Sequence, residues 1–117
     1  MTHRRPALVV DDSPERLAAF RQQFGSAATY VTSYTAAVGA LTATRFDQVW
    51  LDFDLGGAKN GADVAFSLRR LPRQRRPRVF IHSENASGAY SMLTTLRGRF
   101  QVEMRQPPPR SRRRRGA

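Results

Sequence analysis

The stretch Ala7-Leu8-Val9-Val10-Asp11-Asp12 joins a continuous apolar run to two adjacent carboxylates. A short run that is apolar at every position favours a β-strand buried on both faces, as in parallel sheets. Ser13 and Pro14 follow at once, and Ser at the N-cap with Pro at the first helical position indicates the start of a helix. The stretch therefore predicts a strand that ends at Asp11 and leads directly into a helix.

The rest of the chain repeats this alternation of apolar runs and helical patterns. Further strands are predicted at residues 29–34, 48–51, 79–83 and 101–105. Helices are predicted at residues 14–24, 35–45, 62–70 and 86–100. Strands that alternate with helices of this length imply right-handed βαβ units and a parallel sheet. The sequence therefore predicts an α/β domain built on a five-stranded parallel sheet.

Polar side chains end three of the apolar runs at their carboxyl side: Asp11 and Asp12, then Asp52, then Ser83. In an open parallel sheet these positions converge on one edge, where ligands bind. Neighbouring carboxylates need a proton or a metal among them, and oxygen ligands favour Mg²⁺ or Mn²⁺. We therefore expect a divalent metal pocket. The alternative, helix capping, explains Asp12 or Asp54 singly but not the whole set.

Three segments resemble the receiver domains of bacterial response regulators. Leu8 to Ser13 resembles the acidic pair that opens those domains, and Val49 to Asp52 resembles the strand that ends in their phosphoacceptor aspartate. Phe80 to Ser83 resembles the strand that ends in their Ser or Thr. The resemblance spans residues 6–106 and implies a three-layer, flavodoxin-like fold.

The same resemblance implies a role for each site residue. Asp11 and Asp12 would hold Mg²⁺, and Asp52 would be both the phosphoacceptor and a metal ligand. Asp54 would offer its backbone carbonyl to the metal, and Ser83 would bond to the phosphoryl group. A phosphate-bearing ligand is therefore the expected partner of the site.

The chain departs from signalling receivers after its fifth strand. Receivers carry a Lys there, whereas this chain has Met104-Arg105-Gln106-Pro107. Arg105 is the expected source of positive charge for the phosphate, although Arg and Lys are not interchangeable. The fifth helix of receivers is replaced by a proline-arginine segment, so we expect the last helix to be missing.

The chain resembles a divergent branch of receivers more closely than it resembles signalling receivers. This branch is the cyclic-phosphate processing receiver domain of bacteria and their phages. The resemblance rests on the stretch Asp52-Phe53-Asp54-Leu55-Gly56-Gly57 and on His82-Ser83-Glu84-Asn85. The branch typically has a His where this chain has Phe53. Its name implies an association with the processing of nucleic-acid ends.

His82 and Asn85 each allow two interpretations. His82 can donate to a phosphoryl oxygen or act as a general acid, but on an alternating strand it can also point into a face of the sheet. Asn85 opens a helix, where it can cap the helix or help exposed amides to meet a phosphate. We group His82 with Asp52 and Ser83 as candidate catalytic residues, and Asn85 with Arg105 as candidate phosphate-binding residues.

The formal net charge is +11, and the basic residues are 19 Arg and one Lys. Five arginines, Arg110 and Arg112 to Arg115, follow the triple proline that begins at Pro107. Because such a segment continues neither a helix nor a central strand, we expect a receiver-like domain at residues 1–106 and a disordered basic tail at 107–117. The tail could bind nucleic-acid phosphates. A genome rich in G and C is an alternative explanation for the arginines.

The chain lacks cysteine and any apolar run long enough to span a bilayer. Residues 1–10 also lack the apolar segment of a secretory signal. We therefore expect a cytoplasmic protein that does not interact with membranes. The sequence does not identify a protein partner.

Two functions from different classes fit these residues. The first is a receiver-like, Mg²⁺-dependent module that binds or accepts phosphate, and it need not be an enzyme on its own. The second is a metal-dependent phosphoesterase that uses Asp52 as nucleophile on RNA or nucleotide ends, because Asp52-Phe53-Asp54 resembles the Asp-x-Asp of haloacid-dehalogenase-like phosphatases. That motif ends the first strand in those phosphatases and the third predicted strand here, so we favour the module.

Overall fold

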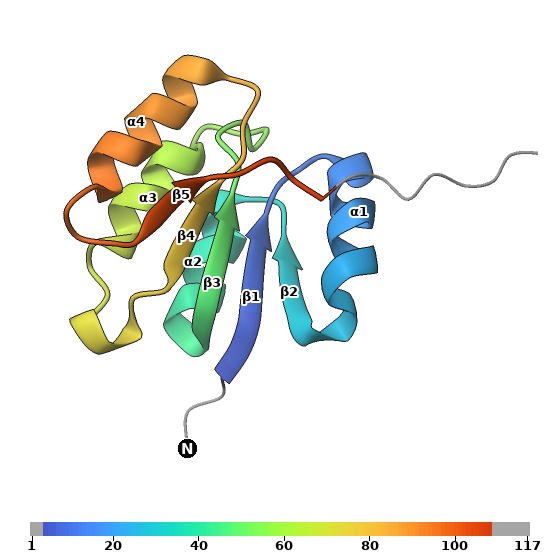
Figure 1. Ribbon diagram of the computed structural model, residues 1–117, viewed down its shortest axis with the longest axis horizontal. Helices are drawn as coiled ribbons and strands as arrows, with labels where there is room; N and C mark the ends of the chain where they lie inside the picture. The colour runs from blue at the N-terminus through green and yellow to red at the C-terminus, as the bar shows by residue number, and fades with distance from the viewer. Residues whose placement is uncertain (1–3, 109–117) are drawn as a thin grey trace, which may run out of the picture.

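The predicted strands form one parallel sheet in the computed structural model, which describes residues 4–108 (Figure 1). The strands are β1 (Arg4–Val10), β2 (Ala28–Val31), β3 (Arg45–Leu51), β4 (Arg78–Ile81) and β5 (Val102–Met104). The helices are α1 (Pro14–Phe24), α2 (Tyr34–Ala43), α3 (Gly61–Leu68) and α4 (Ala86–Leu96), with short 3-10 turns η1 (Gly25–Ala27) and η2 (Arg73–Arg75). The strand order β2-β1-β3-β4-β5 puts the switch in strand order between β1 and β3. The prediction of a flavodoxin-like, five-stranded parallel sheet is confirmed.

Helices cover the sheet on both faces, which gives the predicted three layers. The residues of α2, α3 and α4 pack on one face, and α1 packs on the other (Figure 1). In β1, Leu8 and Val10 point to the first face, whereas Ala7 and Val9 point to the second. All four side chains are fully buried, which explains why this strand is apolar at every position.

Several bounds differ from the predictions: the helix predicted at residues 35–45 ends at Ala43, and β3 begins at Arg45 rather than at residue 48. Two other ends differ for local reasons. The second strand ends at Val31, three residues earlier than predicted, because the Ser33 hydroxyl accepts a hydrogen bond from Ala36 N and begins α2. The fourth helix ends at Leu96 rather than at residue 100. Arg97 has already left helical geometry with a ψ of 137°, and Gly98 after it has a left-handed φ of 83°, so the helix does not continue.

The α1 face of the sheet is left partly without a helix. Within residues 4–108 no helix follows β5, so the prediction that the last helix is missing is confirmed for this part of the chain. Phe80 of β4 lies in this region, where the guanidinium carbons of Arg78 and Arg105 are 5.5 and 5.1 Å from the centre of its ring. Arginine side chains thus cover a ring that a fifth helix would otherwise shield.

Most of the predicted basic tail lies outside the described residues, of which Pro107 and Pro108 are the last. The predicted boundary between domain and tail therefore stays a prediction. Among the helices of residues 4–108, none has both the length and the apolar composition that crossing a bilayer requires.

Candidate functional site

The ends of β1, β3 and β4 place three polar residues in one row at the carboxyl edge of the sheet. The backbone N–H groups of Asp11, Asp52 and His82 each donate to a carbonyl near the end of the neighbouring strand, at 3.0–3.1 Å. These bonds continue the parallel ladders by one residue beyond each strand. The side chains are therefore held by the sheet itself rather than by a free loop.

Three carboxylates meet at this edge. One oxygen from each of Asp11, Asp12 and Asp52 lies within 4.8 Å of the others. Asp11 and Asp52 are 0 % and 2 % exposed, whereas Asp12 is exposed. The exposed side chain of Asp54 does not belong to this group, and the predicted contribution of its backbone carbonyl to the metal stays a prediction. The structure thus brings together the three predicted carboxylates, and their role as metal ligands stays a prediction.

Arg16, which is not among the predicted site residues, contacts two of these carboxylates. Its Nε donates to Asp11 Oδ2 at 2.8 Å, and its Nη2 donates to Asp11 Oδ1 at 3.1 Å and to Asp52 Oδ2 at 3.3 Å. Its Nη1 is 3.8 Å from Oε2 of the exposed Glu84. A planar fork that binds one carboxylate with two N–H groups is a geometry that Arg provides and Lys does not.

The first turn of α1 positions the Arg16 side chain. Ser13 is the N-cap, and its hydroxyl accepts from Arg16 N at 3.2 Å. The Ser13 N–H in turn donates to Asp11 Oδ1 at 2.8 Å, so the buried carboxylate also fixes the start of the helix. The sequence does contain a signal for this arrangement. Arg16 comes three residues after the N-cap Ser13, and Ser13 comes two residues after the acidic Asp11 that ends the apolar run.

Burial and, after it, the negative charge of Asp11 raise the pKa of Asp52 to about 6. Arg16 and a backbone hydrogen bond from Phe53 act in the opposite direction. The hydrogen bond to Asp11 raises the pKa of Arg16, so the guanidinium remains charged. Without a metal, Asp52 is therefore partly protonated at mildly acidic pH, and its neighbour Arg16 limits this protonation.

His82 points into the α1 face of the sheet. Its ring centre is 5.1 Å from that of Phe20 and 6.2 Å from that of Trp50, and it is 3 % exposed. Its Nδ1 is 3.5 Å from Asp11 Oδ2, and neither ring nitrogen has a hydrogen-bond partner of standard geometry among the described residues. The backbone of Trp50 is close enough to favour the protonated form of the ring, although less than burial disfavours it. Burial lowers the pKa of His82 to about 4, so the ring is neutral at physiological pH.

A hollow opens beside the carboxylates. It is lined by Arg16, His82, Ser83, Glu84, Gln106 and Pro107. The half-buried Ser83 hydroxyl accepts from Asn85 N at 3.1 Å, and its own hydrogen can still donate to a ligand. Asn85 caps α4 by accepting from Gly88 N at 2.9 Å, so capping accounts for its side chain.

Arg105 is not brought to the carboxylates. Its guanidinium pairs with Glu103 and lies over the ring of Phe80. Gln106, the next residue, lines the hollow instead. The positive charge beside Asp52 therefore comes from α1, through Arg16, and not from the end of β5 as the sequence suggested.

Two glycines allow the backbone to approach the carboxylates closely. Gly56 has a φ of 46°, and a Cβ at this position would lie 2.8 Å from Asp12 Oδ2. At Gly61, the first residue of α3, a Cβ would lie 2.1 Å from the carbonyl oxygen of Asp52. The Gly56-Gly57 loop is thus shaped around Asp12, and the start of α3 is packed directly on the backbone of Asp52.

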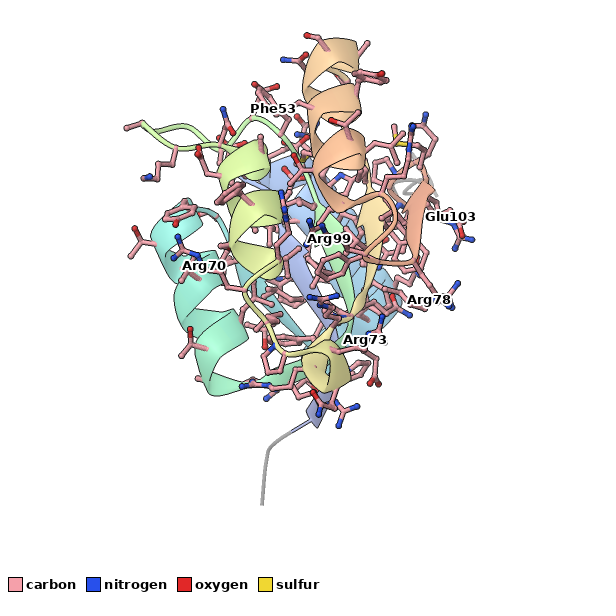
Figure 2. All side chains as sticks on the ribbon, turned by 90° about the vertical axis from the view of Figure 1, so that its left-hand side faces the viewer. Phe53, Arg70, Arg73, Arg78, Arg99 and Glu103 are labelled. Carbon is pink, nitrogen blue, oxygen red and sulfur yellow. The ribbon has the colours of Figure 1, made fainter. Side chains whose placement is uncertain are left out.

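Phe53 stands between Asp52 and Asp54 in the sequence, directly after β3. Its half-buried ring packs on α4, where a Cβ at Gly88 would be 2.3 Å from the ring (Figure 2). The side chain at this position therefore contacts α4. The resembling branch typically has His here, so this chain has an apolar contact in place of a titratable group.

The donor set at this edge fits a hard divalent cation. Carboxylate oxygens supplemented by water are the ligands that Mg²⁺ prefers, and Asp11, Asp12 and Asp52 would supply them. Arg16 already engages oxygens of Asp11 and Asp52. A cation bound here would share these oxygens with the guanidinium or displace it.

Residues 7–98 match the family model described as Cyclic-phosphate processing Receiver domain. No curated protein matches the chain. Similar solved structures include a CheY-like receiver domain from Methylobacillus flagellatus, with 22% identity, a TM-score of 0.64, and coverage of 93% of this chain and 90% of that one. The phosphorylated cyanobacterial phytochrome response regulator RcpA shows 16% identity, a TM-score of 0.68, and coverage of 89% and 80%.

The Mn²⁺-bound form of response regulator Rcp1 is also similar, with 16% identity, a TM-score of 0.65, and coverage of 86% of this chain and 79% of that one. At these identities, the solved structures establish a shared fold and nothing further. The family match covers most of the chain and agrees with the element order described above.

Proposed function

The chain belongs to the cyclic-phosphate processing receiver domain family, and from this premise we propose that it is a Mg²⁺-dependent module that binds or accepts phosphate. The carboxylate edge is the site of the proposed activity. One observation carries the proposal: two buried carboxylates and a third exposed one converge within 4.8 Å, beside a guanidinium and an open hollow. This arrangement suits a cation and a phosphate bound together.

Each residue has a part in this proposal. Asp11, Asp12 and Asp52 would hold Mg²⁺ or Mn²⁺, which when bound would neutralise charge on phosphoryl oxygens. Arg16 borders the hollow and offers N–H groups to the same oxygens. Ser83 donates its hydroxyl hydrogen to the ligand.

Asp52 is the proposed phosphoacceptor. Its carboxylate oxygen would attack the phosphorus of a small donor such as acetyl phosphate, forming an acyl phosphate while the bond to the acetate oxygen breaks and acetate leaves. A protonated carboxyl does not attack, and burial raises the pKa of Asp52 to about 6. The reaction therefore needs a cation beside Asp52 and should slow as the pH falls through this range.

The same site could instead hydrolyse phosphate esters on RNA or nucleotide ends. That reaction calls for a second acid or base near the nucleophile, and the exposed Asp54 lies outside the carboxylate group. His82 is buried with a pKa lowered to about 4, which makes it a poor proton donor near neutral pH. These two features favour the module over the phosphoesterase.

The wider setting is part of the same proposal. We place the protein, of bacterial or phage origin, in the bacterial cytoplasm, in association with cyclic-phosphate ends of nucleic acids. The arginines of the tail, Arg110 and Arg112 to Arg115, would add affinity for nucleic acid. Nothing in the chain specifies a protein partner.

Intact mass and ³¹P NMR test the proposal. The full chain is incubated with Mg²⁺ and acetyl phosphate, and separately with RNA that ends in a 2′,3′-cyclic phosphate. We expect a phosphoryl adduct in the parent that is lost in Asp52→Asn, with the RNA bound but unchanged. Turnover of the RNA that stops in Asp52→Asn would favour the phosphoesterase, and an adduct that persists in Asp52→Asn would exclude Asp52 as the acceptor.

A further inference from the structure

Arginines gather near the amino end of β4, away from the carboxylates. Residues 64–102 contain eight Arg and a single acidic residue, Glu84, which lies beside Arg16 at the carboxylate edge. Five of the eight side chains are exposed: Arg70, Arg73, Arg78, Arg97 and Arg99. We call these five side chains the arginine surface. Its member on β4, Arg78, lies four residues, or ~13 Å along an extended strand, from His82.

Hydrogen bonds hold the segments of the arginine surface side by side. Arg76, next to the η2 turn, donates from Nε to Leu71 O at 3.2 Å and from Nη1 to Arg99 O at 3.5 Å. The η2 turn is thereby tied to the loop that follows α4. Figure 2 shows Arg70, Arg73, Arg78 and Arg99 on one side of the molecule, with Phe53, the neighbour of Asp52, toward the other end of that side.

Several guanidinium groups in this region lie next to an aromatic ring. Arg69 lies over Phe66 at 5.4 Å, Arg76 lies over Phe100 at 5.2 Å, and Arg78 lies over Phe80 at 5.5 Å. The ring of Phe66 is itself 54% exposed. A guanidinium backed by a ring can stack its outer face on a base, and an exposed ring can do the same.

We infer that the arginine surface binds the phosphate backbone of a single-stranded nucleic acid. The exposed arginines supply charge that phosphates would neutralise. The ring-backed guanidinium groups and Phe66 offer stacking that unpaired bases can use and that lipid headgroups cannot. Nucleic acid is already the partner class of the proposed function, but the surface is distinct from the carboxylate edge, so this binding does not depend on metal or phosphoryl chemistry there.

Two double variants of the full chain separate this surface from net charge. Arg73→Gln with Arg99→Gln removes two exposed side chains while keeping the backbone carbonyls that accept from Arg76. Arg5→Gln with Arg21→Gln is the matched control. Those two lie on the β2 side of the molecule, where Arg5 Nη1 donates to Ser26 O at 2.8 Å and Arg21 lies over the ring of Tyr30. Both variants keep the tail, so its contribution is common to them.

Binding is measured by fluorescence anisotropy with a labelled oligouridine RNA over a series of salt concentrations. We expect the first variant to bind about tenfold more weakly at low salt, with a log–log salt slope shallower by about 1.4, at ~0.7 for each phosphate that the variant no longer neutralises. The control should stay within about twofold of the parent. Thermal melts confirm that each variant is folded.

Three results would overturn the inference. Equal losses of affinity in both double variants would assign the binding to net charge or to the tail. A duplex of the same length that binds as tightly as the single strand would exclude the stacking interactions. Phosphatidylserine vesicles that bind more tightly than the RNA, with weaker binding confined to Arg73→Gln and Arg99→Gln, would assign the surface to a membrane.

Discussion

The Arg16 guanidinium binds both oxygens of Asp11, with Nε 2.8 Å from Oδ2 and Nη2 3.1 Å from Oδ1. Asp11 is fully buried, whereas the Arg16 side chain is 29% exposed. The Arg16 guanidinium is therefore held by the buried Asp11 on one side and borders the hollow on the other. A metal that enters the carboxylate edge meets a site whose charge is already partly neutralised.

Replacing Arg16 should weaken the metal-free fold and strengthen metal binding. In Arg16→Gln, Asp11 and Asp52 lose their shared cation, and the loss of charged hydrogen bonds should lower the free energy of unfolding by about 2 kcal/mol. Added Mg²⁺ should restore more stability in this variant than in the parent, since no guanidinium competes for the oxygens. Thermal melts with and without Mg²⁺ measure both effects.

Arg21→Gln is the control for Arg16→Gln, because Arg21 lies on the same helix over the ring of Tyr30. Its removal should leave the response to Mg²⁺ unchanged. If Arg16→Gln and Arg21→Gln have the same melting temperatures with Mg²⁺ and without it, Arg16 does not neutralise the charge of Asp11 and Asp52.

Asp52 and His82 should make opposite contributions to stability between pH 4 and 6. The pKa of Asp52 rises from 3.8 to about 6 on folding, so the folded state binds more protons and this contribution is lost as the pH rises through that range. The pKa of His82 falls from 6.5 to about 4, so its contribution is lost as the pH falls through its range.

Single variants unmask each contribution in metal-free buffer. Relative to the parent, the free energy of unfolding of Asp52→Asn should increase by about 2 kcal/mol as the pH rises from 4 to 6, at up to ~1.4 kcal/mol for each pH unit. His82→Phe should show the opposite trend relative to the parent. Urea unfolding at several pH values measures the differences, and parallel curves for all three proteins would contradict the assignment.

Gly61→Ala should disturb the backbone of Asp52. The new Cβ would lie 2.1 Å from the Asp52 carbonyl oxygen and 2.8 Å from the Cα of Phe53, so α3 must shift. We expect a loss of about 2 kcal/mol or more in stability, as for other overpacked sites, together with weaker metal binding. Gly39→Ala in α2 is the control, since nothing lies within 4 Å of its Cβ position. It should stabilise the helix by up to about 1 kcal/mol, and equal effects of the two changes would refute the close approach.

Gln106→Lys should increase phosphorylation of Asp52 if the site acts as a receiver. Gln106 lines the hollow beside Arg16, so a Lys there can add a cation near the phosphoryl group. Arg105→Lys should have little effect, because Arg105 pairs with Glu103 away from the carboxylates. The yield of phosphoryl adduct by intact mass compares the two, and a larger gain from Arg105→Lys would restore that residue as the cation of the site.

Much of the fold follows directly from the sequence. The apolar run of β1 is buried on both faces, and Ser13 with Pro14 begins α1 as predicted. The meeting of Asp11, Asp12 and Asp52 is also predictable, because parallel strands end at a common edge. These features depend on local sequence patterns and on the fixed handedness of βαβ units, and both can be inferred from the sequence.

The source of the positive charge could not be predicted in the same way. Arg105 follows β5 and seemed to be the natural replacement for a Lys, but its side chain turns to Glu103 and Phe80. Arg16 is one of 19 arginines, and only the direction of the first turn of α1 brings it to Asp11. The direction of a long side chain depends on the packed structure. An arginine can reach several possible partners, and the sequence does not show which of them lies within reach.

The central claim is that the carboxylate edge binds a divalent cation, and isothermal titration calorimetry with Mg²⁺ and Mn²⁺ tests it most directly. The full chain should bind one ion in the micromolar to millimolar range, and Asp12→Asn and Asp52→Asn should each abolish binding. Asp47→Asn is the control, because it removes a carboxylate of β3 outside the cluster, and it should bind like the parent. No heat of binding from the parent at millimolar concentrations of either ion would contradict the account.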